Sequence, residues 1–401
     1  LHKAIRRQRQ MCIRDRYTVV IDAVFGVGLS RTIEGHYKDV IEEMNQIHAE
    51  KVAIDIPSGI SSFDGQVLGT AFHADLTVSF ACEKLGTVLF PGYDYAGEVI
   101  PVEIGIGTKL FEENPEVCYT LEKSDLSKFL PDRKKNSHKG SYGKILMITG
   151  SKGMSGAAYL SARAAYISGG GLVQIYTEES NRTILQQLLP EAIVSTYTEY
   201  EEEKLQSLLK WADVICIGCG LGKSRIAGQI LSYLMKYAEV PCVIDADGLN
   251  LLADHMELLP KEKKPFVLTP HMKEMAGLLG CTIPELGKNR FAALKKFTDS
   301  YGVVCALKDA RTLVTEKDRQ MFLNTAGNSA MAKAGSGDVL AGVITGLLAQ
   351  HMKVYEGTVL GVYLHACGGD AARERRGAYS VLAEDLTEGI AACIKKTEKG
   401  R

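Results

Sequence analysis

Residues 324–350 read NTAGNSAMAKAGSGDVLAGVITGLLAQ, in which glycine-rich turns lead directly into an apolar run from Val339 to Leu348. A glycine-rich turn that opens a helix leaves several backbone N–H groups unpaired, and the helix dipole adds positive charge at the same end. The pattern therefore predicts a binding site for an anion such as phosphate. Asp338 stands at this junction, where a carboxylate can either accept a proton from a hydroxyl group or simply cap the helix.

The overall composition indicates a soluble protein of two globular domains. Its 401 residues exceed one ordinary core, and its contents of 46% hydrophobic and 24% charged residues are those of globular proteins. A formal net charge of −1 provides no electrostatic argument for nucleic acid or an anionic membrane as partner, and no uninterrupted apolar run is long enough to span a membrane. Because the N-terminal region lacks the apolar segment of a secretory signal, we expect a cytoplasmic location.

The ten cysteines show no disulfide framework, which is typical of buried thiols in a reducing compartment. Cys216 and Cys219 form a lone CxxC inside an apolar strand pattern, and no second pair accompanies them. We therefore favour a structural role for these two thiols over zinc or redox chemistry.

The order of polar and apolar segments predicts where the domains begin and end. Residues 1–16 are basic and lack a hydrophobic period, so we expect a disordered tail unrelated to the sequence that follows. Residues 17–118 alternate strands, glycine turns and a helix, which favours a parallel sheet with chemistry at the carboxyl ends of its strands. Residues 119–139 are polar and are predicted to be a linker, and residues 140–401 form the second domain.

In the second domain, one apolar strand after another ends in a polar or glycine-rich loop, which predicts a single composite crevice. Each loop also has a purely structural interpretation when taken alone. His271 can cap a helix, Asp245 and Asp247 can be turn residues, and Lys308 can be a solvated surface lysine. Their common placement at strand ends, beside the predicted anion site, favours a functional role.

Residues 140–390 resemble the ADP/ATP-dependent NAD(P)H-hydrate dehydratases, which have a ribokinase-like fold. The resemblance is carried by KGSYGKILMITGS, GAAYLSARAAYISGGGLV, GCGLG, DADGLN, TPHMKEM and NTAGNSAMAKAGSGDVLAG. Residues 17–107 resemble the latter part of the NAD(P)H-hydrate epimerase domain through DAVFGVGLSR, DIPSGI, HADLTVSF and EKLGTVLFPG. The resemblance implies a three-layer α/β/α dehydratase domain preceded by a truncated, Rossmann-like α/β epimerase domain.

For the second domain, the resemblance implies dehydration of hydrated NADH or NADPH, coupled to hydrolysis of ADP or ATP in the presence of Mg²⁺. Asp338 would be the catalytic base and would also contact the substrate, with the N–H groups of Ser336 and Gly337 stabilising the transferred phosphoryl group. The expected nucleotide-binding residues are Lys308, Asp309, Ala310, Arg311, Thr312, Ser336 and Gly337. The expected residues for the hydrated cofactor are Ala157, Gly220, Gly222 and His271.

For the first domain, the resemblance implies a potassium ion bound by Asp22 and Ser58, and substrate contact by Asp55. The expected phosphate turn consists of Gly26, Val27, Gly28, Leu29, Ser30 and Arg31. The family's Asn- and Gly-rich nucleotide loop is not found before Tyr17, so we expect a truncated domain with weak or absent epimerase activity.

Two departures lie in the second domain, where Asp309 follows Lys308 in place of the family's usual glycine, and Met272-Lys273 stands for its usual Pro-Gly. They concern the shape of the nucleotide pocket and of the His271 loop. Two alternatives stay open, a ribokinase-like kinase of a small alcohol or vitamin precursor and a non-catalytic nucleotide-binding protein. The resemblance also implies a homo-oligomer, and it leaves open the choices between ADP and ATP and between NADH and NADPH.

Overall fold

The computed structural model describes residues 17–107, 109–112, 114, 116–259 and 263–399. The chain divides into two compact units, residues 1–113 and residues 114–401. The predicted disordered tail, residues 1–16, lies outside the described residues.

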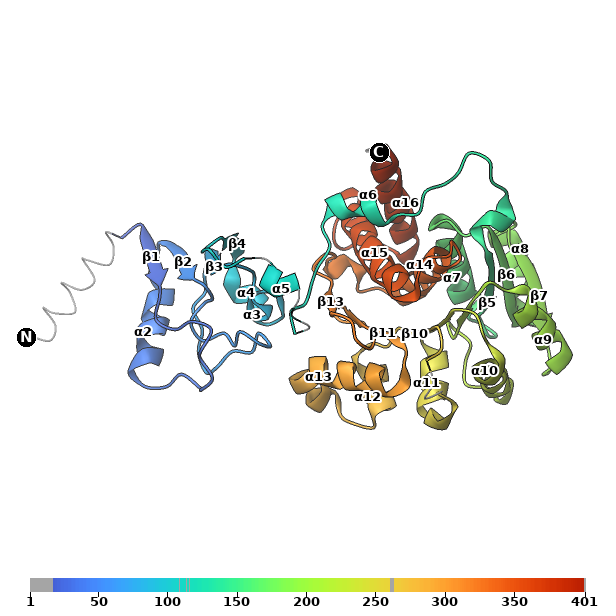
Figure 1. The fold of residues 1–401 in the computed structure, drawn as a ribbon, viewed down its shortest axis with the longest axis horizontal. Helices are drawn as coiled ribbons and strands as arrows, with labels where there is room; N and C mark the ends of the chain where they lie inside the picture. Colours follow the sequence, from blue (N-terminus) through green and yellow to red (C-terminus); the bar gives the residue numbers. More distant parts are fainter. Residues whose placement is uncertain (1–16, 108, 113, 115, 260–262, 400–401) are drawn as a thin grey trace, which may run out of the picture. The chain divides into compact units, whose positions relative to one another are not determined.

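The first unit contains a four-stranded parallel sheet in the order β1-β2-β3-β4, as its alternating sequence predicts (Figure 1). The strands are β1 (Val19–Asp22), β2 (Glu50–Ile54), β3 (Leu76–Phe80) and β4 (Glu98–Val102). The helices are α2 (His36–Asn45), α3 (Leu85–Val88), α4 (Tyr93–Ala96) and α5 (Lys109–Glu112).

One face of this sheet is covered by helices. Ala53 of β2 packs in one cluster with Ile41 of α2, and its neighbour in register, Thr77 of β3, donates a hydrogen bond to the Ala96 carbonyl of α4. Both helices therefore lie against the same side of the strands, as Figure 1 shows.

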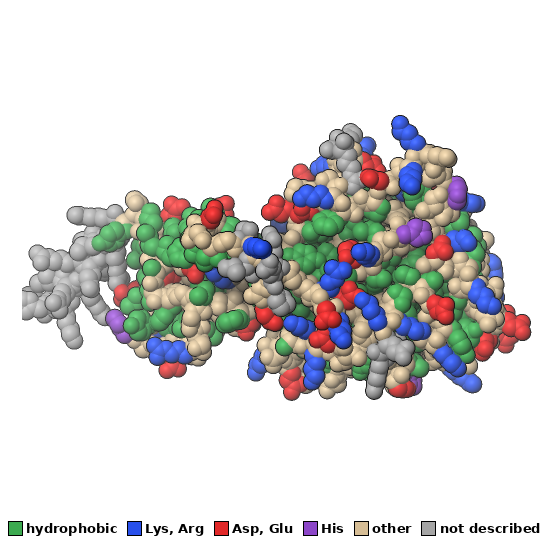
Figure 2. Space-filling view, in the orientation of Figure 1, with side chains coloured by type: hydrophobic (Ala, Val, Ile, Leu, Met, Phe, Trp, Pro, Cys, Tyr) green, Lys and Arg blue, Asp and Glu red, His purple; other side chains and the backbone are tan. Residues whose placement is uncertain are grey.

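On the opposite face of the sheet, several apolar side chains are exposed and no described helix covers them. Val19, Ile21, Phe80 and Ile100 are 38–61% exposed there, and Ile21 is in register with Val52, which is only partly buried. Figure 2 shows hydrophobic side chains gathered over the strands of this unit. Parallel sheets are normally covered on both faces, and large exposed apolar patches usually mark interaction surfaces. This face is therefore available for self-association.

We predict that replacing Ile21 by glutamate shifts the chain towards smaller species, because a charge at the centre of the apolar face opposes its burial. Light scattering across a concentration series measures the effect. The matched control is Leu188→Glu, since Leu188 is 49% exposed on α8 (Arg182–Leu188) of the second unit. A wild-type chain that shows no concentration-dependent association would contradict the prediction.

The second unit is built on a nine-stranded sheet in the order β13-β12-β11-β10-β9-β8-β5-β6-β7. Seven of its strands are parallel, namely β5 (Lys144–Ile148), β6 (Leu172–Glu178), β7 (Ile193–Tyr197), β8 (Val214–Ile217), β9 (Cys242–Ile244), β10 (Phe266–Leu268) and β11 (Val304–Leu307). The last two strands at one end of the sheet, β12 (Leu313–Thr315) and β13 (Phe322–Leu323), pair in antiparallel fashion.

Helices cover both faces of this sheet, which confirms the predicted three-layer arrangement (Figure 1). One layer consists of α7 (Ser155–Ile167), α14 (Ser336–Leu348), α15 (Val354–Arg376) and α16 (Ala383–Lys399). The other contains α10 (Arg225–Tyr237), α11 (Asp247–Ala253), α12 (Met272–Leu279) and α13 (Ile283–Tyr301). The chain also forms α6 (Leu126–Phe129), α8 and α9 (Glu202–Trp211). No helix among the described residues is long and apolar enough to cross a membrane.

Helices α7 and α14 pack so closely that glycine is required at their contact. A Cβ atom added to Gly342 would lie 2.1 Å from the Ser161 carbonyl oxygen, and one added to Gly346 would lie 2.4 Å from the Ala165 carbonyl oxygen. Because glycine lacks this atom, the backbones can approach one another. The contact positions the start of α14, and with it Asp338, beside the carboxyl ends of the strands.

Residues 119–139 differ from the predicted linker, because much of this segment packs on the second unit. Tyr119 forms a β-bridge with Phe322, while Leu121 and Leu126 are buried in the main core. Arg133 lies over the Tyr142 ring, with its guanidinium carbon 3.7 Å from the ring centroid. The few apolar residues in this polar segment pack against residues about 200 positions further along the chain. The composition of the segment does not reveal such distant contacts.

Candidate active site

The start of α14 has the geometry of an anion site. Gly335 precedes the helix with a φ of 90°, a left-handed conformation that favours glycine. Ser336 donates its N–H to the Lys333 carbonyl at 3.2 Å, whereas the N–H groups of Gly337 and Asp338 have no acceptor among the described residues. The predicted pair of donors is thus shifted by one residue, from Ser336 and Gly337 to Gly337 and Asp338.

Asp338 does not cap α14. It is the third residue of the helix, and no side-chain capping hydrogen bond is made at this end. Its carboxylate is free for a chemical role.

A buried ion pair lies beside this helix start. The Lys308 Nζ atom is 2.6 Å from Asp245 Oδ1 and 3.9 Å from Glu274 Oε2, and Asp245 Oδ1 also accepts a hydrogen bond from Thr269. A Cβ added to Gly337 would lie 3.5 Å from Lys308 Nζ. The same Cβ would lie 3.7 Å from Asp245 Oδ2, so both members of the ion pair adjoin the unpaired N–H groups. Sequence reasoning missed the pairing of Lys308 with Asp245 and Glu274.

Burial by itself lowers the pKa of Lys308, but the carboxylates of Asp245 and Glu274 outweigh it, so the pKa lies above its ordinary value. The lysine is therefore charged at neutral pH. Burial raises the pKa of Asp338 to about 6, and the negative charge of Asp245 acts in the same direction. A carboxylate with this pKa is suited to proton transfer near neutral pH.

The loops after β5 and β8 lie side by side, and three of the predicted substrate residues lie in the second of these loops or in the first turn of α7. Ser151 N donates to the Gly220 carbonyl at 2.6 Å, and Gly222 N donates to Asp247 Oδ2 at 2.8 Å. A Cβ added to Gly220 would lie 2.8 Å from the Ala157 Cβ. The structure thus brings Ala157, Gly220 and Gly222 together at the carboxyl ends of the central strands.

His271 caps α12, as its structural interpretation predicts. Its Nδ1 atom accepts from Glu274 N at 3.1 Å, and Glu274 Oε2 accepts from His271 N at 2.8 Å. The Lys308 N–H donates to the Pro270 carbonyl at 2.7 Å, which places His271 next to the predicted nucleotide loop. Half of the side chain is exposed, so it can still contact a ligand.

The predicted nucleotide loop after β11 uses its side chains largely within the protein. Asp309 forms an ion pair with Arg290 at 3.0 Å, and the buried Arg311 donates to the Thr325 carbonyl at 3.0 Å. Thr312 is also buried, and its carbonyl accepts from Asn324 N at 2.9 Å. These contacts shape the backbone from Lys308 through Ala310 to Thr312.

In the first unit, the predicted metal residues form a compact group of oxygen atoms. Asp22 is buried and accepts from the Ser58 hydroxyl at 2.6 Å and from Ser58 N at 2.7 Å. The Ser58 hydroxyl is also 3.2 Å from the Phe25 carbonyl oxygen. The predicted phosphate turn, residues 26–31, begins directly beyond Phe25 and is largely exposed.

Asp55 lies at the carboxyl end of β2 with a positive φ of 70°. It forms an ion pair with Lys84, a residue that sequence reasoning did not single out. Lys84 also donates to the Phe80 carbonyl at 2.7 Å and to the Ser79 hydroxyl at 3.1 Å. In the sequence, the only indication of a functional role for Lys84 is that it lies in the EKLG segment that resembles the epimerase family.

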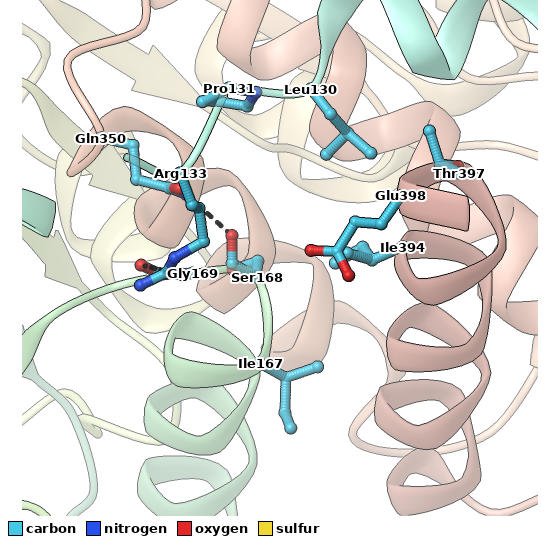
Figure 3. Close-up of a pocket in the computed structure, with 10 residues that line it drawn as sticks. All are labelled: Leu130, Pro131, Arg133, Ile167, Ser168, Gly169, Gln350, Ile394, Thr397 and Glu398. Carbon is cyan, nitrogen blue, oxygen red and sulfur yellow. Dashed lines mark hydrogen bonds between the residues drawn. The ribbon is translucent and has the colours of Figure 1, made fainter. Parts of the chain in front are cut away.

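A cavity of about 290 Å³ lies elsewhere in the second unit, at the C-terminal ends of α7 and α14 (Figure 3). Two of its polar side chains are bound within the protein, since Gln350 donates to the Ser168 carbonyl at 2.8 Å and Arg133 donates to the Gly169 carbonyl at 3.4 Å. This cavity lies at the other end of α14 from Asp338, beyond Leu348, so the two are separated by about 15 Å along the helix axis. It is therefore not part of the site described above.

Comparison with known proteins assigns families to both units. Residues 145–392 match the family described as NAD(P)H-hydrate dehydratase, and residues 2–86 match the family described as YjeF-related protein N-terminus. The bifunctional NAD(P)H-hydrate repair enzyme of Moorella thermoacetica is 36% identical over 95% of this chain and 73% of its own length. That of Escherichia coli is 33% identical over 92% of this chain and 70% of its own length.

Two solved structures resemble the second unit. A ribokinase-like superfamily protein from Enterococcus faecalis has a TM-score of 0.64 and 31% identity, covering 69% of this chain and 95% of that one. The second is the ADP/ATP-dependent NAD(P)H-hydrate dehydratase from Bacillus subtilis, co-crystallised with ATP and Mg²⁺. It has a TM-score of 0.60 and 29% identity, and the match covers 69% of this chain and 97% of that one.

We predict that Asp338→Asn stabilises the protein at neutral pH. The native pKa of about 6 exceeds the ordinary value of 3.8, so wild-type stability falls as the pH rises between these values, and the deficit is complete above pH 6. The neutral asparagine avoids this loss, so the free energy of unfolding of the variant should exceed that of the wild type by about 1–3 kcal/mol above pH 6. Chemical denaturation at pH 4 and pH 7.5 measures it, with the exposed Asp299→Asn as control. Equal stabilisation at both pH values would contradict the assignment.

Proposed function

This chain belongs to the family of bifunctional NAD(P)H-hydrate repair enzymes, and we propose that the crevice at the start of α14 is where it dehydrates hydrated NADH or NADPH. One observation carries the proposal. The carboxylate of Asp338, whose pKa is raised to about 6, adjoins two unpaired N–H groups and the Lys308 ammonium. The site thus combines a base with an anion-binding group.

The chemistry follows from the poor leaving ability of hydroxide. Asp338 accepts the proton of the substrate hydroxyl while that oxygen attacks the terminal phosphorus of the nucleotide, and AMP or ADP departs. The N–H groups of Gly337 and Asp338 and the Lys308 ammonium stabilise negative charge on the transferred phosphoryl group. The ring-nitrogen lone pair then expels phosphate, and loss of a ring proton restores the dihydropyridine.

We assign the binding roles by position. The backbone of residues 308–312 would hold the nucleotide, because the Asp309 and Arg311 side chains already have protein partners. Ala157, Gly220, Gly222 and His271 would hold the hydrated cofactor, since their loops adjoin Asp247 and the Lys308 strand end.

Mg²⁺ accompanies ATP in crystals of the Bacillus subtilis relative. No group of three metal-binding side chains occurs among the described residues of this chain. We therefore propose that Mg²⁺ enters on the phosphate oxygens of the nucleotide, where it would neutralise their charge.

The similarity to repair enzymes argues against the two alternatives, a small-alcohol kinase and a non-catalytic binding protein. The bifunctional repair enzymes align over more than 90% of this chain, including the first unit that a simple kinase would not need. We further propose a cytoplasmic homo-oligomer with a small-molecule substrate and no nucleic-acid or membrane partner. A net charge of −1 supports the absence of polyanionic partners.

We predict that the wild-type chain restores the NADH absorbance band of hydrated NADH when ADP or ATP is supplied. Asp338→Asn should lower kcat by about 10²–10⁴, with nucleotide binding retained, because the positioned base is lost. The kcat/KM profile of the wild type should fall below pH about 6, where Asp338 is protonated. Near wild-type turnover by the variant would refute the role of Asp338.

For the first unit, we propose an epimerase site at the carboxyl ends of β1 and β2. The carboxylate of Asp22, the Ser58 hydroxyl and the Phe25 carbonyl are suitable ligands for a potassium ion, because all three provide oxygen atoms. Residues 26–31 would contact the substrate phosphates, and Asp55 would contact the reacting nucleotide. Lys84 would hold the Asp55 carboxylate in place.

We predict that epimerisation by this chain is at least about tenfold slower than its dehydration. A Cβ added to Gly26 or Gly28 would meet no atom within 4 Å, so the turn is open to water, which weakens electrostatic catalysis. Conversion of the R to the S hydrate without adenine nucleotide measures the rate. Asp55→Ala should abolish it and the exposed Asp39→Ala should not. Equal rates of both reactions would contradict the prediction.

A further inference from the structure

The loop that leads into α14 packs on one face of α15. Ala366, Gly369 and Asp370 are three and four residues apart, so they lie on the same side of this helix. A Cβ atom added to Gly327 of the loop would lie 3.4 Å from the Ala366 Cβ. One added to Gly369 would lie 2.2 Å from the Met331 Sδ atom, so Met331 packs directly against the backbone of α15.

Asp370 provides the polar contacts of this face. Its Oδ1 atom accepts from Asn328 Nδ2 at 2.7 Å, and its Oδ2 atom accepts from Gly327 N at 3.2 Å. Both carboxylate oxygens therefore bind the loop, and hydrogen bonds to a charged acceptor are stronger than those between neutral groups. Helix α15 thus fixes the loop at Gly327 and Asn328.

A series of hydrogen bonds continues from Asn328 along the loop. Asn328 Oδ1 accepts from Ala330 N at 3.0 Å, and the Asn328 carbonyl accepts from Met331 N at 3.1 Å. Lys333 N in turn donates to the Met331 carbonyl at 2.8 Å. The turn that follows Asn328 is therefore held by bonds that begin at the Asn328 side chain.

The other end of the same loop reaches the proposed catalytic groups. Ser336 N donates to the Lys333 carbonyl at 3.2 Å, and the Ser336 hydroxyl lies 3.4 Å from Nε2 of His365 on α15. The next two residues are Gly337 and Asp338, whose N–H groups have no acceptor among the described residues. Helix α15 therefore contacts the loop at both ends, and its second contact directly precedes the turn that carries Asp338.

We propose that Asp370 is a positioning residue for the dehydration, and that it holds the loop of residues 327–335 so that the start of α14 is correctly placed for the reaction. The inference rests on the proposed function of this crevice. Asp370 is not among the groups assigned to substrate or nucleotide, so it acts through Asn328 and the turn that follows. Such an indirect role has a large effect on rate, because a misplacement of about 1 Å can cost about 10²-fold.

The test uses the polarity of the pair formed by Asn328 and Asp370. In Asp370→Asn, the new amide oxygen can still accept from Gly327 N, but its NH₂ group then faces the NH₂ group of Asn328. Asn328 cannot turn over without losing its bond from Ala330 N. In Asn328→Asp, two carboxylates face one another. The double variant, Asn328→Asp with Asp370→Asn, again places a donor opposite an acceptor and keeps the net charge of the wild type.

We expect each single variant to lower kcat about 10–100-fold, because the catalytic groups at the start of α14 are displaced. The KM for hydrated NADH and the calorimetric Kd for ADP should change by less than about threefold. The double variant should recover most of kcat. A selective loss of kcat separates positioning from a purely structural role, which would lower the melting temperature and leave kcat of the folded enzyme unchanged.

The matched control is Asp213→Asn. Asp213 Oδ2 accepts from Lys144 N at 2.9 Å at the start of β5, and the other end of this strand leads to the crevice. This variant should keep the kcat of the wild type. Melting temperatures above the assay temperature establish that the variants are folded.

Three outcomes would overturn this inference alone, in a chain whose wild type is active. The first is a wild-type kcat in both single variants, and the second is a loss of kcat that the double variant does not recover. The third is single variants that melt below the assay temperature while the double variant melts with the wild type, since the pair would then be structural only. A wild type without dehydration would overturn the proposed function and the inference together.

Discussion

The ion pair between Asp245 and Lys308 is the interaction on which the crevice of the second unit depends. Both side chains are largely buried, and each would be an uncompensated charge without the other. Breaking such a pair by removal of one partner typically costs about 3–5 kcal/mol. The pair connects the ends of β9 and β11, and Thr269 after β10 and Glu274 of α12 join the same network. Four neighbouring elements are thereby tied to one point.

This network also sets the electrostatic conditions at Asp338. The Asp245 charge opposes ionisation of Asp338, whereas Lys308 favours it, and burial shifts the balance towards the protonated form. The result is a carboxylate that destabilises the native state at neutral pH and is suited to proton transfer for the same reason. Functional sites often carry such local destabilisation because the groups are arranged for the reaction rather than for stability.

The two units illustrate different ways of burying a parallel sheet. In the second unit, helices cover both faces, and the glycines of α14 allow α7 to pack directly against it. In the first unit, the described helices cover one face, and exposed apolar side chains remain on the other. The site residues of the first unit are nevertheless well ordered by hydrogen bonds, as the contacts among Asp22, Ser58 and Phe25 show.

The sequence by itself determined the alternation of strands and helices, the glycine-led start of α14 and the motifs that indicate the family. These features are local, because strand periodicity, turn residues and helix starts are encoded within a few positions. Only the tertiary structure decided that Asp338 is not a cap, that Lys308 pairs with Asp245, and that the Cys219 thiol lies 3.9 Å from an Asp245 carboxylate oxygen. It also placed Leu126 in the core rather than in a linker. Each of these contacts joins residues far apart in the chain, so their energies depend on distances that no local pattern specifies.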